Sequence, residues 1–208
     1  MVTLFSSSKT CAVLALAVAA GIAFASHPAA AEKNKKKNDS SSYWSISFLG
    51  GELFPRRDMR STHDAGLAAG GRVGWTSSMG LGLYLAVDYA PLARNATSDP
   101  LESFETHFGL VTVQPSYTLS WKSLRLWVAG GVGMAAERTR RFYRDVAGER
   151  RTDYSPAASA VSGLELHLFN GGGLVVTASY SRLFKAVGFT DVKYEFVNLT
   201  GGFVFAFR

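Results

Sequence analysis

From residue 43 to the C-terminus, large apolar side chains alternate with small or polar ones at every second position. The last eight residues, GGFVFAFR, show this most clearly, because Phe203, Phe205 and Phe207 would lie on one side of an extended strand. A period of two is the period of a β-strand, and no segment keeps an apolar stripe at helical spacing over three turns. This part of the chain is therefore predicted to be all-β.

Eight segments carry the alternation, and most of them have the length of strands that cross a bilayer at a tilt. The connections between them alternate between tight turns and long polar loops. In an up-and-down sheet, that alternation places every tight turn at one end, which is typical of outer-membrane barrels. The predicted strands span residues 43–54, 66–75, 81–90, 106–120, 124–137, 157–168, 173–184 and 194–207.

The two faces of these strands indicate what surrounds the barrel. In segment 81–90, Leu83 and Leu85 lie on one face, whereas Gly82 and Ala86 lie on the other. A soluble barrel would carry long polar side chains on the face that meets water. Small residues instead fit the crowded interior of an eight-stranded barrel, which leaves the large apolar side chains facing lipid. The sequence predicts a closed, up-and-down antiparallel transmembrane β-barrel of eight strands.

The N-terminus has the features of an export signal. Lys9 precedes an apolar run over residues 11–25, and small residues follow, so that cleavage is expected after Ala25 or Ala31. The run is shorter than the roughly 20 apolar residues that a spanning helix needs. We interpret residues 1–31 as a cleaved signal peptide, 32–42 as a flexible lysine-rich periplasmic tail and 43–208 as the barrel.

Cysteine content and charge exclude several classes of function. The single cysteine, Cys11, lies in the predicted signal, so the exported chain has no thiol for disulfides, cysteine zinc sites or thiol catalysis. No cofactor or metal is predicted. The formal net charge of +6 favours an anionic partner. Because no nucleic-acid motif is present, we expect anionic lipid or polysaccharide and no nucleic acid.

Several features of the chain together resemble a known class of protein. They are the export signal, the eight strands, the alternating loop lengths, the GGELFP segment at residues 50–55 and the C-terminal aromatic alternation. Residues 43–208 are similar to the small outer-membrane β-barrel proteins of Gram-negative bacteria, the class of the OmpA barrel and OmpX. The resemblance implies an outer-membrane location in contact with lipid and lipopolysaccharide, and assembly with periplasmic chaperones and the barrel-assembly machinery. We also expect a monomer.

The resemblance gives the last strand a second role. In this class, a C-terminal strand that ends on an aromatic residue is similar to the signal read by the barrel-assembly machinery. Phe203, Phe205 and Phe207 are therefore predicted to form the assembly signal. The chain departs from the class pattern because Arg208 follows the last phenylalanine.

Five charged or titratable residues fall at positions predicted to face the lumen. Buried charges must be paired, and these carry both signs. We interpret them as a charge network that fills the barrel without leaving an open pore, because eight strands enclose little more than side chains. The alternative is a catalytic or proton-relay cluster. The network residues are Arg72, Asp88, Arg125, Glu165 and His167.

The third long connection, residues 137–154, is rich in arginine. Guanidinium groups bind phosphate in a bidentate manner, so this loop is predicted to bind lipopolysaccharide phosphates or another acidic surface ligand. The alternative is a solvated loop whose charges pair with one another. The predicted ligand-binding residues are Arg138, Arg140, Arg141, Arg144, Arg150 and Arg151.

The sequence therefore predicts a non-catalytic barrel with a structural or surface-interaction role, such as envelope integrity or ligand contact through basic loops. One alternative is a lipid A modifying barrel enzyme, an acyltransferase or a deacylase. No histidine has a serine two residues on, as the deacylase type would require, but Ser61, His63 and Asp64 supply the residue types of the acyltransferase. A second alternative is a secreted soluble lipocalin-like barrel that binds an apolar ligand.

Overall fold

The fold is seen in a computed structural model of the 208-residue chain. The predicted signal peptide, nearly all of the predicted tail, Arg144 and Arg208 lie outside the described residues. Among the residues that are described, no helix is long and apolar enough to cross a membrane. The structure describes residues 42–57, 59–60, 63–93, 102–143, 146–169, 171–184 and 194–207, without the side chains of 93, 102–104, 141–143, 146–147 and 149.

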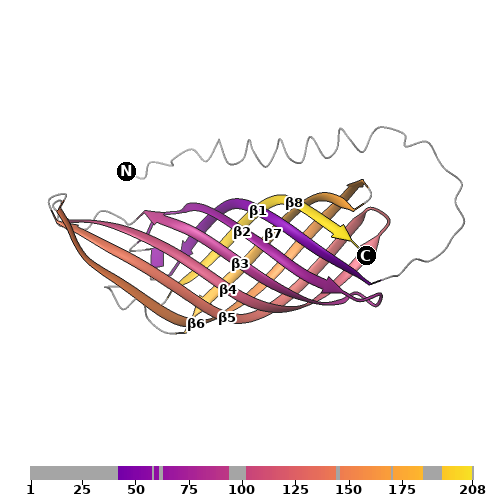
Figure 1. The fold of residues 1–208 in the computed structure, drawn as a ribbon, viewed down its shortest axis with the longest axis horizontal. Helices are drawn as coiled ribbons and strands as arrows, with labels where there is room; N and C mark the ends of the chain where they lie inside the picture. Colours follow the sequence, from indigo (N-terminus) through magenta and orange to yellow (C-terminus); the bar gives the residue numbers. More distant parts are fainter. Residues whose placement is uncertain are drawn as a thin grey trace, which may run out of the picture.

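Eight strands form one closed barrel in which each strand pairs with its neighbour in sequence and β8 pairs with β1 (Figure 1). Every pairing is antiparallel. This confirms the predicted fold class and all eight predicted strands. The strands are β1 (Tyr43–Arg56), β2 (Gly66–Thr76), β3 (Leu81–Ala93), β4 (Glu102–Trp121), β5 (Leu124–Tyr143), β6 (Val146–Phe169), β7 (Gly172–Leu183) and β8 (Glu195–Phe207).

The two ends of the barrel differ. One end, the turn end, holds the start of β1, the end of β8 and the tight turns that lead into β3, β5 and β7. Gly80 and Gly171 each adopt a φ of 86° in two of these turns, a conformation that glycine reaches without a steric penalty. The opposite end, the loop end, holds the longer connections. The alternation of short and long connections is as predicted except between β5 and β6, which only two residues join.

Large apolar side chains cover the outer wall. Along β3, Leu83 and Leu85 are 53 % and 44 % exposed, whereas Tyr84 and Ala86 between them are buried in the lumen. So extensive an apolar surface is stable only when lipid covers it. Exposed aromatic rings collect at the turn end, where membrane barrels carry an interfacial aromatic girdle. This distribution contradicts a soluble lipocalin-like barrel. The girdle comprises Trp44, Trp75, Trp121, Phe169 and Phe207.

Three adjacent strands are much longer than the others. β4 and β5 have 20 residues each and β6 has 24, whereas the other five have 11 to 14. These three strands therefore project as a sheet beyond the rest of the barrel at the loop end (Figure 1). The prediction of a long loop after residue 137 was wrong, because β5 continues to Tyr143 and β6 starts at Val146. The strand ends that were not predicted, residues 138–143 and 146–156, consist mainly of polar residues. Without large apolar side chains at every second position, a strand there cannot be recognised from the sequence.

The lumen has two different halves. Its loop-end half is filled with apolar side chains, in which the rings of Phe108 and Phe196 meet at 4.9 Å. Its turn-end half holds the five residues of the predicted charge network, and a further carboxylate, Glu137, is buried nearer the loop end. The predicted charge network therefore fills only half of the barrel, because apolar side chains pack the remainder without needing charged partners. The apolar cluster contains Leu53, Met59, Ala68, Ala90, Leu92, Phe108, Leu110, Ala135, Ala157, Leu183, Tyr194 and Phe196.

Candidate functional site

Arg72 on β2 is buried in the turn-end half of the lumen. Its guanidinium lies 4.4 Å from the centroid of the Trp127 ring, a cation–π contact. Tyr84 stacks against the same ring, with centroids 6.1 Å apart. Gly163 leaves the space for Trp127, because a Cβ there would come within 2.3 Å of the indole ring. Asp88 is the carboxylate whose charge acts on Arg72. Arg72 is therefore enclosed by partners from its own chain.

A second charged group lies nearer the turn end. Arg125 on β5 and Glu165 on β6 are direct cross-strand partners, with a nitrogen of the guanidinium 4.0 Å from the carboxylate. Nε2 of His167 lies 3.2 Å from the same Glu165 carboxylate. The guanidinium of Arg125 also lies 4.1 Å from the Tyr43 ring. The structure thus places the five predicted lumen residues in the lumen, where Arg125, Glu165 and His167 are in contact and Arg72 interacts electrostatically with Asp88.

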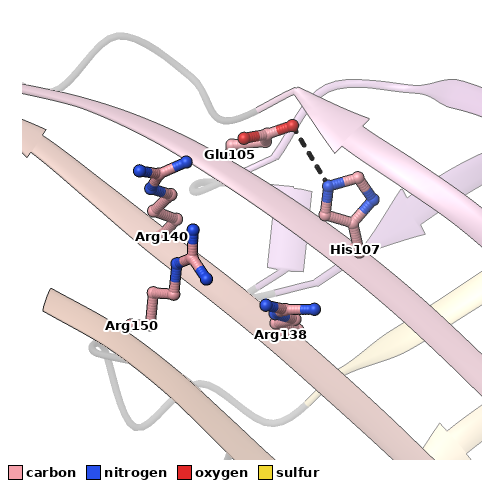
Figure 2. Close-up of a pocket in the computed structure, with 5 residues that line it drawn as sticks. All are labelled: Glu105, His107, Arg138, Arg140 and Arg150. Atoms are coloured by element: carbon pink, nitrogen blue, oxygen red, sulfur yellow. Dashed lines mark hydrogen bonds and ion pairs between the residues drawn. The ribbon is translucent and has the colours of Figure 1, made fainter. Parts of the chain in front are cut away.

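On the outer face of the projecting sheet, arginines from two strands line an open groove of about 210 Å3. Figure 2 shows the five side chains, with Arg140 and Arg150 next to each other and Glu105 across from them. The strand pairing explains this placement, because Arg140 on β5 is the direct partner of Glu105 on β4 and of Arg150 on β6. We call this site the arginine groove; its lining residues are Glu105, His107, Arg138, Arg140 and Arg150.

The charges of the arginine groove are unbalanced. Arg140 and Arg150 carry like charges and are directly opposed on neighbouring strands, an arrangement that disfavours strand pairing. The carboxylate of Glu105 already accepts a hydrogen bond of 3.1 Å from Nε2 of His107. Among the residues that the structure describes, no ion pair includes Arg138 or Arg150. The groove can therefore accept an anion at little cost to its existing contacts.

The predicted ligand-binding arginines do not all lie together. Arg138, Arg140 and Arg150 share the groove, but Arg151 points to the opposite face of the sheet, where its Nε lies 2.8 Å from Oδ2 of Asp153. The side chain of Arg141 lies outside the described part of the chain, as does the whole of Arg144. Because side chains alternate along a strand, adjacent arginines of a hairpin cannot contact the same ligand.

Three residues of this region escaped the sequence analysis. Glu105 and His107 lie on β4 and Tyr89 on β3, at least 30 residues before the predicted loop. The hydroxyl of Tyr89 and Nδ1 of His107 share a hydrogen bond of 2.6 Å, and the two rings stack with an interplanar angle of 19°. Glu105 and His107 stand at every second position in line with the outward apolar residues that follow them, so the sequence could have placed both on the outer wall. Only the register could connect it to the arginines.

The three C-terminal phenylalanines lie on the outer wall at the seam where the barrel closes. Phe203 is the direct partner of Phe48 on β1, and Phe207 is the partner of Trp44. All three are 44–59 % exposed. Their role as an assembly signal stays a prediction.

The residues considered for lipid A chemistry are not gathered at an open surface. His63 is only 3 % exposed and meets the ring of Tyr194 edge-on at 5.4 Å. Asp64 is exposed, and Ser61 lies outside the described residues. Within the described ranges, no group of three or more histidine, cysteine or acidic residues is arranged to hold a metal ion.

Comparison with known proteins identifies the fold. No protein-family model and no curated protein sequence matches the chain. A major outer-membrane protein of Thermus thermophilus is similar in structure, with a TM-score of 0.61 at 11 % identity, over 80 % of this chain and 99 % of the other. Neisserial surface protein A is also similar in structure, with a TM-score of 0.54 at 14 % identity, over 80 % of this chain and 99 % of the other. Ail of Yersinia pestis was solved with the heparin analogue sucrose octasulfate. It has a TM-score of 0.50 at 16 % identity, over 79 % of this chain and 97 % of the other. The chain has the fold of small outer-membrane β-barrels.

Proposed function

We propose that this protein is a non-catalytic barrel of the outer membrane whose arginine groove binds phosphate groups of lipopolysaccharide in the surrounding leaflet. The observation that carries the proposal is the direct opposition of Arg140 and Arg150 beside Arg138, at the edge of the lipid-facing surface. An anion between these guanidinium groups would remove their mutual repulsion and accept charge-assisted hydrogen bonds.

The position of the groove favours a ligand with both an anionic and an apolar part. On β5, the outward stripe passes from Val132 and Met134, both at least half exposed, to Arg138 and Arg140. On β4, it passes from Val111 to His107 in the same direction. The groove therefore opens sideways, directly above the apolar surface. A lipid with acyl chains against that surface would hold its headgroup phosphates beside the arginines.

The wider role follows from the fold and the lumen. The apolar cluster at the loop end supports a barrel without an open pore, so the outer surface is the part available to partners. The predicted export signal supports delivery to the outer membrane. Ail, which has a similar fold, was solved with a polyanionic sugar, and this supports anion binding on such a barrel. Contact with lipopolysaccharide in turn supports a role in envelope integrity.

The test is a titration of detergent-solubilised protein with lipopolysaccharide. Replacing Arg138, Arg140 and Arg150 together by glutamine should raise the dissociation constant at least about tenfold, because charge-assisted hydrogen bonds contribute about 1.5–3 kcal/mol each. The wild-type affinity should also fall as salt is added, because salt screens exposed charges. A heat-dependent shift in gel mobility would show that each variant forms a closed barrel.

The matched control replaces arginines elsewhere on the outer wall. Arg57 and Arg182 both contact the Glu195 carboxylate, at 3.1 Å and 3.5 Å, so each already has an anionic partner. Their replacement by glutamine should leave the affinity for lipopolysaccharide unchanged. Losses in proportion to the three and two charges removed would show that binding follows net charge, and wild-type binding by the groove variant would contradict the proposal.

A further inference from the structure

We infer that the stacked Tyr89–His107 pair beside the arginine groove binds the face of a sugar ring, so that the ligand of this site is a phosphorylated sugar headgroup. The inference rests on the proposed function, because it names the ligand class of the same site. The arginines alone would accept any phosphate. The aromatic pair adds a flat surface that a phosphate does not need.

The two rings form one exposed surface on the outer wall. Tyr89 comes from β3 and is 46 % exposed, and the His107 side chain is 37 % exposed. The strand pairing places Gly109 directly opposite Tyr89, on the same face as His107. A Cβ at Gly109 would meet no atom within 4 Å. The absence of a side chain at this position therefore leaves the space beside the rings open.

The hydrogen bonds of the pair hold the rings in place before any ligand arrives. His107 uses Nδ1 for the Tyr89 hydroxyl at 2.6 Å and Nε2 for Glu105 at 3.1 Å. With both nitrogens engaged, the imidazole has a fixed orientation and the ring faces are left for contact. Preorganisation of this kind lowers the entropic cost of binding. Glu105 is thus accounted for as the residue that orients His107.

The geometry of a sugar phosphate fits this arrangement. One face of a pyranose ring presents C–H groups, which pack on aromatic rings, while its substituents extend from the ring edge. Arg138 is the direct cross-strand partner of His107, so a phosphate on that edge would reach a guanidinium. A sugar next to the apolar wall also has room for attached acyl chains. These contacts select a phosphorylated glycolipid of the same leaflet rather than a soluble sugar.

The experiment compares two lipids that share a phosphate but differ in the sugar. Detergent-solubilised full-length protein is titrated with diphosphorylated lipid A and with phosphatidylglycerol, which has no sugar ring. Tyr89→Leu should raise the dissociation constant for lipid A about tenfold, the size of effect seen when a ring loses its stacking partner. It should leave the affinity for phosphatidylglycerol unchanged, and Tyr89→Phe should retain most of the binding of lipid A.

A second variant blocks access without removing an aromatic ring. Gly109→Val fills the open space beside the pair and should weaken lipid A binding alone. Two matched controls exist: Gly130→Val, at another outward glycine with open space, and Tyr117→Leu, at a tyrosine of equal exposure near the turn end. Both controls should bind lipid A as the wild type does. Heat-dependent gel mobility verifies that all five variants are folded.

The outcomes separate this inference from the proposed function. Wild-type binding of lipid A by Tyr89→Leu and Gly109→Val would overturn the sugar site, and so would an equal loss for both lipids. Tighter binding of sucrose octasulfate than of lipid A by the wild type would overturn the choice of a glycolipid. Wild-type binding of both lipids by the triple arginine variant would instead overturn the proposed function.

Discussion

Arginine occurs in two contrasting environments in this barrel. Inside the lumen, Arg72 lies over Trp127 near Asp88, and Arg125 lies over Tyr43 beside Glu165. On the outer face of the projecting sheet, arginines of β5 and β6 are opposed across the strand pairing instead. The interior guanidinium groups lie against aromatic rings and interact with carboxylates of the lumen, whereas the outer ones face one another around an open groove.

The difference suggests a criterion that distinguishes structural arginines from ligand-binding ones, namely whether the fold itself supplies the balancing charge. A buried charge without a partner would be too costly, so the lumen arginines must be balanced by the fold itself. At the outer face, water and ions reduce the repulsion between like charges, and the sheet can tolerate it. An unbalanced cluster is therefore tolerated at the outer face, where water, ions or a ligand can reach it, and would not be tolerated in the lumen. The predictions below test this contrast, from the largest expected effect to the smallest.

Removing the lumen arginine should have the largest effect. Arg72→Met leaves Asp88 without its positive partner, which should lower the free energy of unfolding by about 3–5 kcal/mol. Urea unfolding in lipid vesicles, followed by tryptophan fluorescence, measures this change. The double variant Arg72→Met/Asp88→Leu should lose less than Arg72→Met alone. Strict additivity of the two substitutions would show that the pair is not coupled.

Placing an arginine lower on the outer wall tests why the groove lies where it does. Val128 is on the same strand and the same outward face as Arg138, but within the apolar surface and away from the aromatic girdle. Val128→Arg should lower the free energy of unfolding by about 2–4 kcal/mol, because the charge would lie in lipid. The same urea titration measures it. A variant as stable as the wild type would mean that β5 does not face lipid at this height.

Disturbing the aromatic partner of Arg72 should have an intermediate effect. Gly163→Ala brings a methyl group into the Trp127 ring, which must move away from the guanidinium. Such overpacking should lower the free energy of unfolding by about 1–3 kcal/mol. Gly130→Ala, at an outward glycine with open space, is the control and should match the wild type. Equal stability of the two variants would indicate that Trp127 is loosely held.

Single arginines on the outer wall should have the smallest effects, with opposite signs. Arg182→Gln removes one of the two ion pairs of Glu195, while Arg57 keeps the other, and should lower the free energy of unfolding by up to about 1 kcal/mol. Arg150→Gln relieves the repulsion of Arg140 and should raise it by about 0.2–1 kcal/mol when no ligand is bound. Both differences should shrink at high salt in the urea titration. Destabilisation by Arg150→Gln would show that the groove is internally paired.

Much of the fold was predictable because a period of two assigns every residue of a strand to one face. The alternation at residues 81–87 placed the leucines outside and the small residues inside, and the structure agrees. The short turns also predicted the up-and-down order. The projecting hairpin was missed because arginine, threonine and glutamate alternate there without an apolar partner, so the segment had the composition of a loop.

The sequence by itself determined the barrel, its lipid-facing wall and the presence of an arginine-rich region. Only the tertiary structure decided which arginines act together. Antiparallel register set Arg140 opposite Arg150 and brought His107 from β4 and Tyr89 from β3 to the same surface. It also divided the lumen into a charged and an apolar half. Local periodicity records which face a residue occupies, whereas register depends on pairing between distant strands, which no single segment contains.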